Sequence, residues 1–451
     1  MSKAADSANS FGQVKPVEMQ KLLQLDAKSM LSAFKQQSFA FWMICCYFFF
    51  EYVRPHAIIR ELDVLPWMQL FILLSAVGLF LGKRSGKSSG MSVLFWLIVF
   101  FVVILISGYF SFRPAFAWSS LDKYYLWAII FFLITRVAYT EKHLFFLLAI
   151  FFVASLKMSV FGARVWAMRG FSFTSWGMKG PPGFFENSGE LAVQMVVFFA
   201  VSFYIAKGLM PYVDGWRRWL LMATPVTAAM TVMAASSRGS QVALLVQLYF
   251  IFLHGRISIR AFLVAGVVGF VTYHALPDEQ WERFSEIGED RTSVQRMLYW
   301  ENGWEMMKEN PAFGVGYFNF IPYFETYYPE DMLYDNGQLA HNIFVQVGAD
   351  LGFIGLAVYL ILVYLGFSIP RKSIRLLRSA GMDEDWRVPT AKGLALGFLG
   401  FLIGGQFVSI VYYPFMWMHL ALSCVLHSSV RNSAVQREEL PIPMSRQNAT
   451  T

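Results

Sequence analysis

Long apolar segments recur along almost the whole of this chain and constrain its fold more than any other feature. A helix needs about 20 mainly apolar residues to cross the hydrocarbon core of a bilayer. Only 15% of the residues are charged, whereas a soluble domain carries about 25%. The sequence therefore predicts an all-α polytopic membrane protein. We place about twelve apolar segments of near-spanning length, at residues 37–50, 64–82, 92–112, 115–135, 143–160, 189–206, 219–236, 240–254, 259–275, 341–366, 393–410 and 412–429.

Lysine and arginine residues concentrate in alternate connections between these segments, beginning with the N-terminal tail. Short basic loops stay on the cytoplasmic side of a membrane, so an even number of spans places both termini there. We expect cytoplasmic tails at 1–36 and 430–451, nine transmembrane helices in 37–275 and three in 341–429, and a large outer loop domain at 276–340.

The formal net charge of +7 fits basic loops that meet anionic lipid headgroups, and we expect no nucleic-acid partner. We expect no cleavable signal peptide, because the first apolar segment follows about 36 mainly polar residues. Cys45, Cys46 and Cys424 all lie in predicted spans, so they offer no disulfide framework.

Arg238 is the first residue on the predicted outer side that suits a phosphate ligand. It lies in the segment ASSRGSQVALL (235–245), between two spans. The small polar neighbours leave its guanidinium group accessible and expose backbone N–H groups, which together can bind phosphate. The alternative is an arginine that only reaches the lipid headgroups.

A second set of candidates lies on a predicted helix that begins near Asp290 and stops at Pro311. Arg296, Trp300 and Trp304 recur at intervals of four residues and share one helix face. Such a stripe suits a sugar or a lipid headgroup, and it equally suits packing of the helix onto the membrane face.

His341 and Asn342 stand where an acidic, tyrosine-rich outer loop meets the next apolar segment. A histidine at such a junction can titrate near neutral pH and still be held firmly. Asn342 beside it is a further candidate for substrate binding.

Two other outer loops carry basic residues. Arg169 and Lys179 lie in the glycine-rich and aromatic loop 161–188, and we expect them to contact substrate. Arg54 and His56 in the first outer loop could meet an anionic ligand, although anchoring at the membrane interface is the favoured interpretation.

Asp122 and Lys123 lie inside the predicted fourth span. Charges at that depth usually face a cavity or each other. The sequence leaves open whether this pair lines a cavity or marks the outer end of the helix.

The outer side carries no Asp-x-Asp motif and no Cys/His ligand set. We therefore expect neither a metal site nor a cofactor.

Three features occur in a fixed order and together resemble the O-antigen ligase and polymerase superfamily of bacterial envelope glycosyltransferases. Arg238-Gly239 follows a span; the helical R-x-x-x-W precedes P-x-x-G-x-G; and His341-Asn342 leads into Asp350-x-Gly-x-x-Gly355. The resemblance covers roughly residues 185–365. The opening EYVRPH…LPW resembles a subgroup found with exopolysaccharide systems.

The resemblance implies a GT-C-like, metal-independent, inverting glycosyltransferase in the bacterial inner membrane. Its donor would be a glycan on undecaprenyl diphosphate, and its active site would face the periplasm. The histidine of the family falls on His341 and one arginine on Arg238; the other falls on Arg296 or Arg291. Asp350 takes a position that is often Glu in the family, which leaves its role open.

The chemistry of these residues agrees with the resemblance. Two arginines can neutralise a diphosphate leaving group, and a histidine of near-neutral pKa can accept the proton of a sugar hydroxyl. The alternative is a polytopic transporter or flippase for a lipid-linked glycan, which would carry its ionisable groups near the middle of the bilayer. Ligase and polymerase remain alternatives, so the acceptor could be a glycan, a lipid or a protein.

Overall fold

The computed structural model describes residues 17–82, 88–174, 177–252 and 289–438. Helices and their connections make up these residues, which contain no strand. Helices α1 to α5 are Val17–Leu23, Ala27–Lys35, Phe39–Val53, Pro55–Ile58 and Trp67–Leu81, with a 3-10 turn η1 at Arg60–Leu62. Helices α6 to α12 are Met91–Tyr109, Pro114–Ser119, Asp122–Val137, Glu141–Met168, Ser188–Leu209, Trp216–Ala234 and Arg238–Phe252. Helices α15 to α19 are Arg291–Glu309, Phe320–Tyr327, Ile343–Ser379, Arg387–Gly404 and Pro414–Glu438, with η2 at Pro329–Asp331.

The predicted all-α fold is confirmed, and each predicted apolar segment within the described residues corresponds to one helix, except 115–135, which covers α7 and most of α8. The ninth predicted segment, 259–275, lies outside the described residues, as does much of the predicted loop domain 276–340. Within the described part, four helices are long and apolar enough to cross a membrane by length and composition: α6, α9, α10 and α17; α5 is apolar but shorter. Twelve spans therefore remain a prediction.

The prediction was wrong at two segment boundaries. The fourth span was expected at 115–135, but the chain breaks at Ser120 and Leu121 between α7 and α8, so Asp122 opens a helix rather than lying inside one. The eleventh span was expected to run to residue 410, but α18 ends at Gly404 and residues 405–413 form an irregular loop. Hydropathy could not locate this end, because the loop residues Val408, Ile410 and Val411 are themselves apolar and buried.

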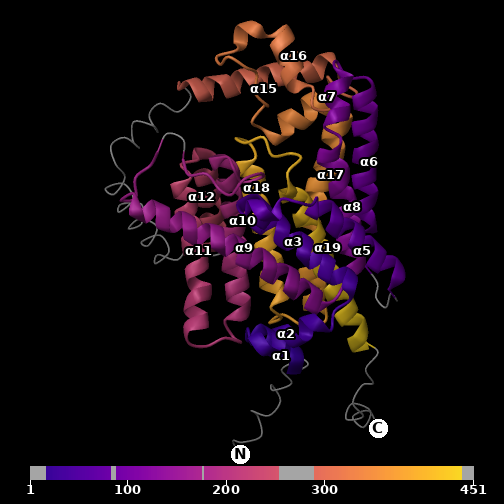
Figure 1. Ribbon diagram of the computed structural model, residues 1–451, viewed down its shortest axis with the longest axis vertical. Coiled ribbons are helices and arrows are strands. Elements are labelled where there is room, and N and C mark those ends of the chain that lie inside the picture. The colour runs from indigo at the N-terminus through magenta and orange to yellow at the C-terminus, as the bar shows by residue number, and fades with distance from the viewer. Residues whose placement is uncertain (1–16, 83–87, 175–176, 253–288, 439–451) are drawn as a thin grey trace, which may run out of the picture.

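The helical body has two ends of different character (Figure 1). Helices α15 and α16 cover one end, here called the loop end, and α1 and α2 lie at the opposite end. There Lys142 forms an ion pair with Glu18 at 2.6 Å, and Arg217 donates to the carbonyl of Gln24 at 3.0 Å. Two connections that the charge pattern assigned to the cytoplasmic side thus meet the N-terminal helices, and we call this the basic end.

Small residues let the central helices approach closely. Helix α18 packs against α10 through Gly393 and Gly397. A Cβ added to Gly393 would lie 3.3 Å from the carbonyl oxygen of Ala200, and one on Gly397 would lie 3.1 Å from that of Val197. Close backbone approach is how helices associate in a membrane, where apolar side chains gain little by leaving lipid.

The periphery of the body is apolar. Leu73, Phe80, Phe95, Val153 and Leu245 are each more than half exposed. A soluble protein rarely presents so much large apolar surface, whereas lipid requires it. The exterior therefore supports a membrane-embedded protein independently of hydropathy.

Candidate active site

His341 is held at the loop end by a loop from another part of the chain. Its backbone N–H donates to Ser409 Oγ at 3.0 Å, and its Nδ1 lies 3.5 Å from the same oxygen. Its Nε2 lies 3.1 Å from Gln338 Oε1. Because the amide oxygen can only accept, this arrangement places the imidazole proton on Nε2 and leaves Nδ1 to accept. His341 also has a φ of +50°, a strained value for a non-glycine residue that persists only where the surroundings fix it.

Trp300 and Asn342 fix the backbone on either side of His341. The Trp300 indole N–H donates to the carbonyl of Ala340 at 2.9 Å. Asn342 caps α17, accepting from the N–H groups of Phe344 and Val345. It also donates to Gln406 Oε1 at 3.1 Å. The structure therefore gives both residues a positioning role next to the histidine.

Arg238 begins α12 and points toward the start of α15. Its Nη2 pairs with Asp290 Oδ2 at 2.9 Å, and both side chains are partly exposed. Asp290 is also the N-cap of α15, for which the sequence had offered Asp290 or Thr292, and it accepts from the backbone N–H and the hydroxyl of Ser293. Burial acts to raise the pKa of Asp290, but the hydrogen bonds from Ser293 and Arg238 hold it below its ordinary value. This carboxylate therefore stays ionised and orients the guanidinium group.

The turn that carries Arg238 is clamped on both sides. Gly177 packs so tightly on the carbonyl of Ala235 that a Cβ would clash, and a Cβ on Gly239 would clash with the Phe407 ring. Phe407 in turn packs on Trp300, with ring centroids 6.4 Å apart. One aromatic side chain thus connects the arginine turn with the helix that carries Arg296.

Arg296 shares an electrostatic environment with both Arg238 and His341. Its Nε is buried and has no hydrogen-bond partner in the described part of the chain. Burial, and then the charge of Arg238, lower the pKa of Arg296. Burial, and then the charge of Arg296, lower the pKa of His341 to about 4. The near-neutral pKa expected from the sequence is therefore wrong for the protein without substrate: His341 is uncharged at pH 7.

The remaining predicted residues lie away from this cluster. Arg291 is exposed, with its guanidinium 4.4 Å from the ring centroid of Tyr334. Arg169 and Lys179 are exposed on the loop after α9. Among the described residues none of the three forms an ion pair with the Arg238 cluster. Of the two arginines that the sequence left open, the structure thus brings Arg296 to the histidine and Arg238.

The glycine pattern before the histidine has a structural explanation. The residues around Gly314 pack on a kink in α17, where Gly352 has a φ of +67°. The approach is so close that a Cβ on Gly314 would clash with the backbone of Ala349. Asp350 is fully buried, and its Oδ1 accepts from the N–H of Phe320 at 3.1 Å. Its carbonyl accepts from Ser107 Oγ at 2.8 Å. The structure therefore uses Asp350 to hold the loop.

Sequence reasoning missed the contribution of residues 405–413. Beyond Gln406, Phe407 and Ser409, the carbonyl of Gly405 accepts from the N–H of Ile343 at 2.9 Å. The sequence analysis did not recognise this loop, because most of it lies within the predicted apolar segment 393–410. The only sequence signal for a loop there is the presence of two polar residues, Gln406 and Ser409, in that segment.

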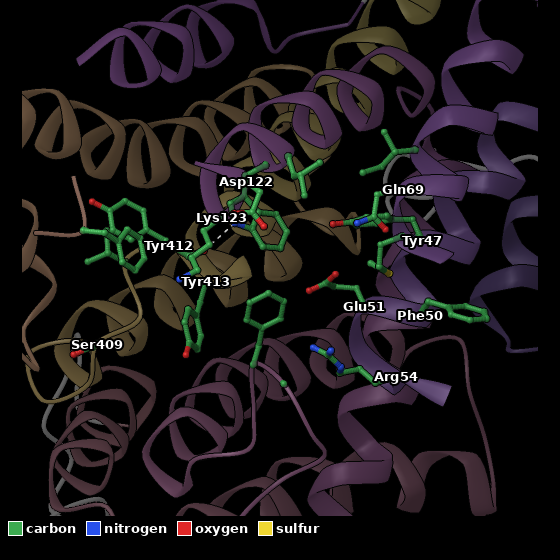
Figure 2. Close-up of a pocket in the computed structure, with 18 of the residues that line it drawn as sticks. Tyr47, Phe50, Glu51, Arg54, Gln69, Asp122, Lys123, Ser409, Tyr412 and Tyr413 are labelled. Carbon is green, nitrogen blue, oxygen red and sulfur yellow. Dashed lines mark hydrogen bonds between the residues drawn. The ribbon is translucent and has the colours of Figure 1, made fainter. Parts of the chain in front are cut away.

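A cavity of about 600 Å³ opens beside the histidine loop (Figure 2). Ser409, Leu339 and Gln346 form the wall that it shares with the surroundings of His341. Its other polar lining residues are Tyr47, Glu51, Arg54, His56, Gln69, Asp122, Lys123, Tyr412 and Tyr413. Asp122 and Lys123 thus line a cavity at the start of a helix, which combines the two interpretations that the sequence left open.

This arrangement can support a substitution at the anomeric carbon of a sugar, in which a hydroxyl replaces a diphosphate group. Two guanidinium groups can hold a diphosphate, and an uncharged imidazole can accept a proton. Within the described residues, no three His, Cys, Asp or Glu side chains gather as a metal site would require; metal independence remains a prediction.

Comparison with known families gives a match in the same part of the chain. A family model described as O-Antigen ligase matches residues 223–360, which include Arg238, Arg296 and His341. No curated protein matches the chain. This match supports the resemblance seen in the sequence: residues 223–360 are similar to the O-antigen ligase domain of the O-antigen ligase and polymerase superfamily.

Proposed function

We propose that this protein transfers a glycan from undecaprenyl diphosphate to a sugar hydroxyl of an acceptor, at the periplasmic face of the bacterial inner membrane. The reaction class covers a ligase and a polymerase, and the subgroup resemblance favours exopolysaccharide synthesis. We further propose a GT-C-like arrangement of about twelve spans and an inverting mechanism that needs no metal.

The observation that carries the proposal is the meeting of three residues from separate segments. Arg238, Arg296 and His341 come from α12, α15 and the loop before α17. The charge of Arg238 lowers the pKa of Arg296, and the charge of Arg296 lowers the pKa of His341, which supports their closeness. A scaffold protein has no need to gather two arginines around a histidine at the cost of an unpartnered buried guanidinium nitrogen.

Arg238 and Arg296 bind the diphosphate of the donor in this mechanism. As the bond between the anomeric carbon and the diphosphate oxygen breaks, its electron pair stays on the diphosphate. The two guanidinium groups stabilise the charge that develops there. The unpartnered Nε of Arg296 gives the diphosphate a donor that no described protein group uses.

His341 accepts the proton of the attacking hydroxyl. The acceptor oxygen forms the new bond to the anomeric carbon from the face opposite the diphosphate, and its proton passes to Nδ1. The pKa of about 4 makes the imidazole uncharged but weakly basic. The positive charge of Arg296 lowers the pKa of His341. A bound diphosphate offsets this charge and so raises the pKa of His341, which makes the imidazole a stronger base once the donor is bound.

The test uses the purified protein in proteoliposomes with lipid-linked glycan and acceptor. We expect glycan transfer that survives EDTA. Activity that is lost on chelation and restored by Mg²⁺ would contradict the metal-free account. Movement of lipid-linked glycan across the bilayer without any transfer would favour the flippase alternative.

The orientation is tested in whole cells with an impermeant thiol reagent. The native cysteines give a low background, since Cys45 and Cys424 are buried and Cys46 is half-buried. A cysteine at exposed Asp335 should react from outside, whereas one at exposed Arg375 should not. The reverse pattern would remove the site from the periplasm.

A further inference from the structure

The cavity beside the histidine loop is distinct from the diphosphate-binding residues. Its lining comes from α3, α4, α5, α8 and α17 and from the loop residues 54, 183–184, 318, 339 and 409–413, and includes none of Arg238, Asp290 or Arg296. It borders the histidine through Ser409, whose hydroxyl accepts from the His341 backbone N–H at 3.0 Å. Ser409 thus connects the cavity with His341.

Buried polar atoms without partners concentrate along the cavity wall. Five of its lining residues have a buried side-chain atom for which the described residues offer no hydrogen bond: Glu51 Oε1, Arg54 Nε, His56 Nδ1, Gln346 Oε1 and Tyr412 Oη. Glu51, Gln346 and Tyr412 are 4%, 1% and 4% exposed. A buried polar group without a partner costs about 1–3 kcal/mol, so several around one cavity indicate a polar ligand.

The chemistry of the wall favours a saccharide over an anion or a lipid chain. Figure 2 shows Glu51 of α3 and Arg54, the residue directly after α3, pointing into the space that Asp122 and Lys123 of α8 also line. The carboxylates of Glu51 and Asp122 balance the cations of Arg54 and Lys123, so the wall has no excess of positive charge that would select a phosphate. The unpartnered polar atoms would not be satisfied by an acyl chain. Sugar hydroxyls both donate and accept, and so can satisfy carboxylate, guanidinium, amide and phenol groups together.

The aromatic residues of the cavity are placed where they can support these polar groups. The Arg54 guanidinium lies 5.4 Å from the ring centroid of Phe184. It also fills the space where a Cβ of Gly183 would be. Lys123 Nζ lies 4.3 Å from the ring centroid of Phe318. Flat apolar faces beside fixed polar groups are the usual composition of a small-molecule site.

We propose that this cavity binds the acceptor saccharide and presents its reacting hydroxyl at Ser409 and His341. The proposal rests on the proposed glycosyl transfer and assigns the acceptor side of that reaction. The donor diphosphate binds Arg238 and Arg296 on one side of His341, and the acceptor approaches from the other. The first outer loop and the Asp122–Lys123 pair, which the diphosphate mechanism does not use, then belong to the acceptor site.

The first test separates acceptor binding from donor binding by steady-state kinetics in proteoliposomes. Tyr412→Phe and Glu51→Gln act on Tyr412 Oη and Glu51 Oε1, which have no hydrogen-bond partner among the described residues, so neither should lower the thermal unfolding midpoint. Glu51→Gln should raise KM for the acceptor by about 10-fold or more, since a hydrogen bond to a charged group is worth about 1.5–3 kcal/mol. Tyr412→Phe should raise it by a few-fold, since a neutral hydrogen bond is worth about 0.5–1.5 kcal/mol. KM for the lipid-linked donor should stay unchanged. Tyr364→Phe and Glu301→Gln are matched controls on exposed positions and should leave both constants unchanged.

The second test measures binding without catalysis. A cysteine at Gln69, an exposed residue of the cavity wall, is labelled with a small thiol reagent. Glycan from the cells that produce the protein, freed of its lipid, should protect this cysteine from labelling, whereas undecaprenyl diphosphate should not.

Protection by the lipid diphosphate alone, or an unchanged acceptor KM in both cavity variants, would overturn the assignment while transfer itself stands. Absence of transfer by the wild-type protein would instead refute the proposed function. If the wild-type protein shows no transfer, protection of the cysteine at position 69 by the glycan would still identify the cavity as a saccharide site. Lack of protection would refute the saccharide site as well.

Discussion

Each end of the helical body buries arginine side chains, but only at the basic end does a buried arginine use every guanidinium nitrogen in a hydrogen bond. At the basic end, Arg387 is fully buried and every guanidinium nitrogen has a partner. Its Nε and Nη2 donate to Asp385 at 2.9 and 3.1 Å, and its Nη1 donates to the Ser429 carbonyl and the Ser433 hydroxyl. Glu141 lies 3.6 Å away.

At the loop end, by contrast, Arg296 and Arg54 each keep a buried Nε without a partner in the described residues. The contrast separates two uses of a buried arginine. A guanidinium with all its donors used fixes helices to one another, and a ligand gains nothing there. A guanidinium with a spare donor carries a desolvation cost that a bound ligand can offset. Incomplete hydrogen bonding, more than charge itself, distinguishes the functional end.

The strongest test of the loop end is His341→Ala. We expect glycan transfer to fall by a factor of about 10² to 10⁴, the usual contribution of a general base. Binding of a lipid diphosphate analogue should persist, because the histidine acts on the acceptor. Transfer and analogue binding are measured on the same preparation. Near-normal transfer would reduce His341 to a residue that shapes the end of a helix.

The matching test of the basic end is Arg387→Met. Removing the arginine takes the guanidinium charge away from the buried carboxylate of Asp385, and breaking a buried pair costs about 3–5 kcal/mol. We expect a lower thermal unfolding midpoint and reduced expression, with unchanged KM values in the protein that folds. Arg378→Met is the control, since Arg378 pairs with Asp383 at 3.7 Å on an exposed surface and such pairs contribute at most about 1 kcal/mol. A specific loss of donor binding in the Arg387 variant would break the contrast between the ends.

Arg238→Ala and Arg296→Ala should each weaken both donor binding and turnover. Loss of one electrostatic contact to a developing charge costs a factor of about 10² to 10³ in kcat. Lysine at either position should restore activity only in part, because a point charge replaces a planar fork. Donor KM and kcat are measured together, with expression checked for each variant.

Arg291→Ala is the internal control for this pair. Arg291 is exposed over the Tyr334 ring, and such a contact is worth about 0.5–1 kcal/mol. We expect only a few-fold effect. An essential Arg291 with a dispensable Arg296 would refute the assignment of the cluster.

The smallest effect at neutral pH concerns the acid limb of the pH profile. Because the imidazole must be unprotonated to act as a base, kcat/KM should fall as the pH drops through the pKa of His341, which is about 4. Arg296→Gln removes a charge that lowers this pKa, so the limb should move to higher pH. A limb near pH 6.5 that Arg296→Gln does not shift would show that the two residues are not electrostatically coupled.

The sequence by itself determined the helical class, the positions of most helices and the identity of the charged residues at the loop end. Apolar segments and basic connections are local properties that follow directly from the cost of burying charge and backbone in lipid. The cap at Asp290 and the stop before Pro311 were also readable, because capping depends on neighbours in the chain.

Only the tertiary structure decided which of these residues meet. Phe407 and Ser409 lie more than 60 residues beyond His341 in the chain, yet they fix the arginine turn and the imidazole. Their loop is as apolar as a helix, so periodicity could not reveal it. The pKa of His341 likewise depends on burial and on Arg296, which no local pattern encodes. The ends of the fourth and eleventh predicted spans were misplaced for the same physical reason: buried loops and buried helices share one composition, and long-range packing distinguishes them.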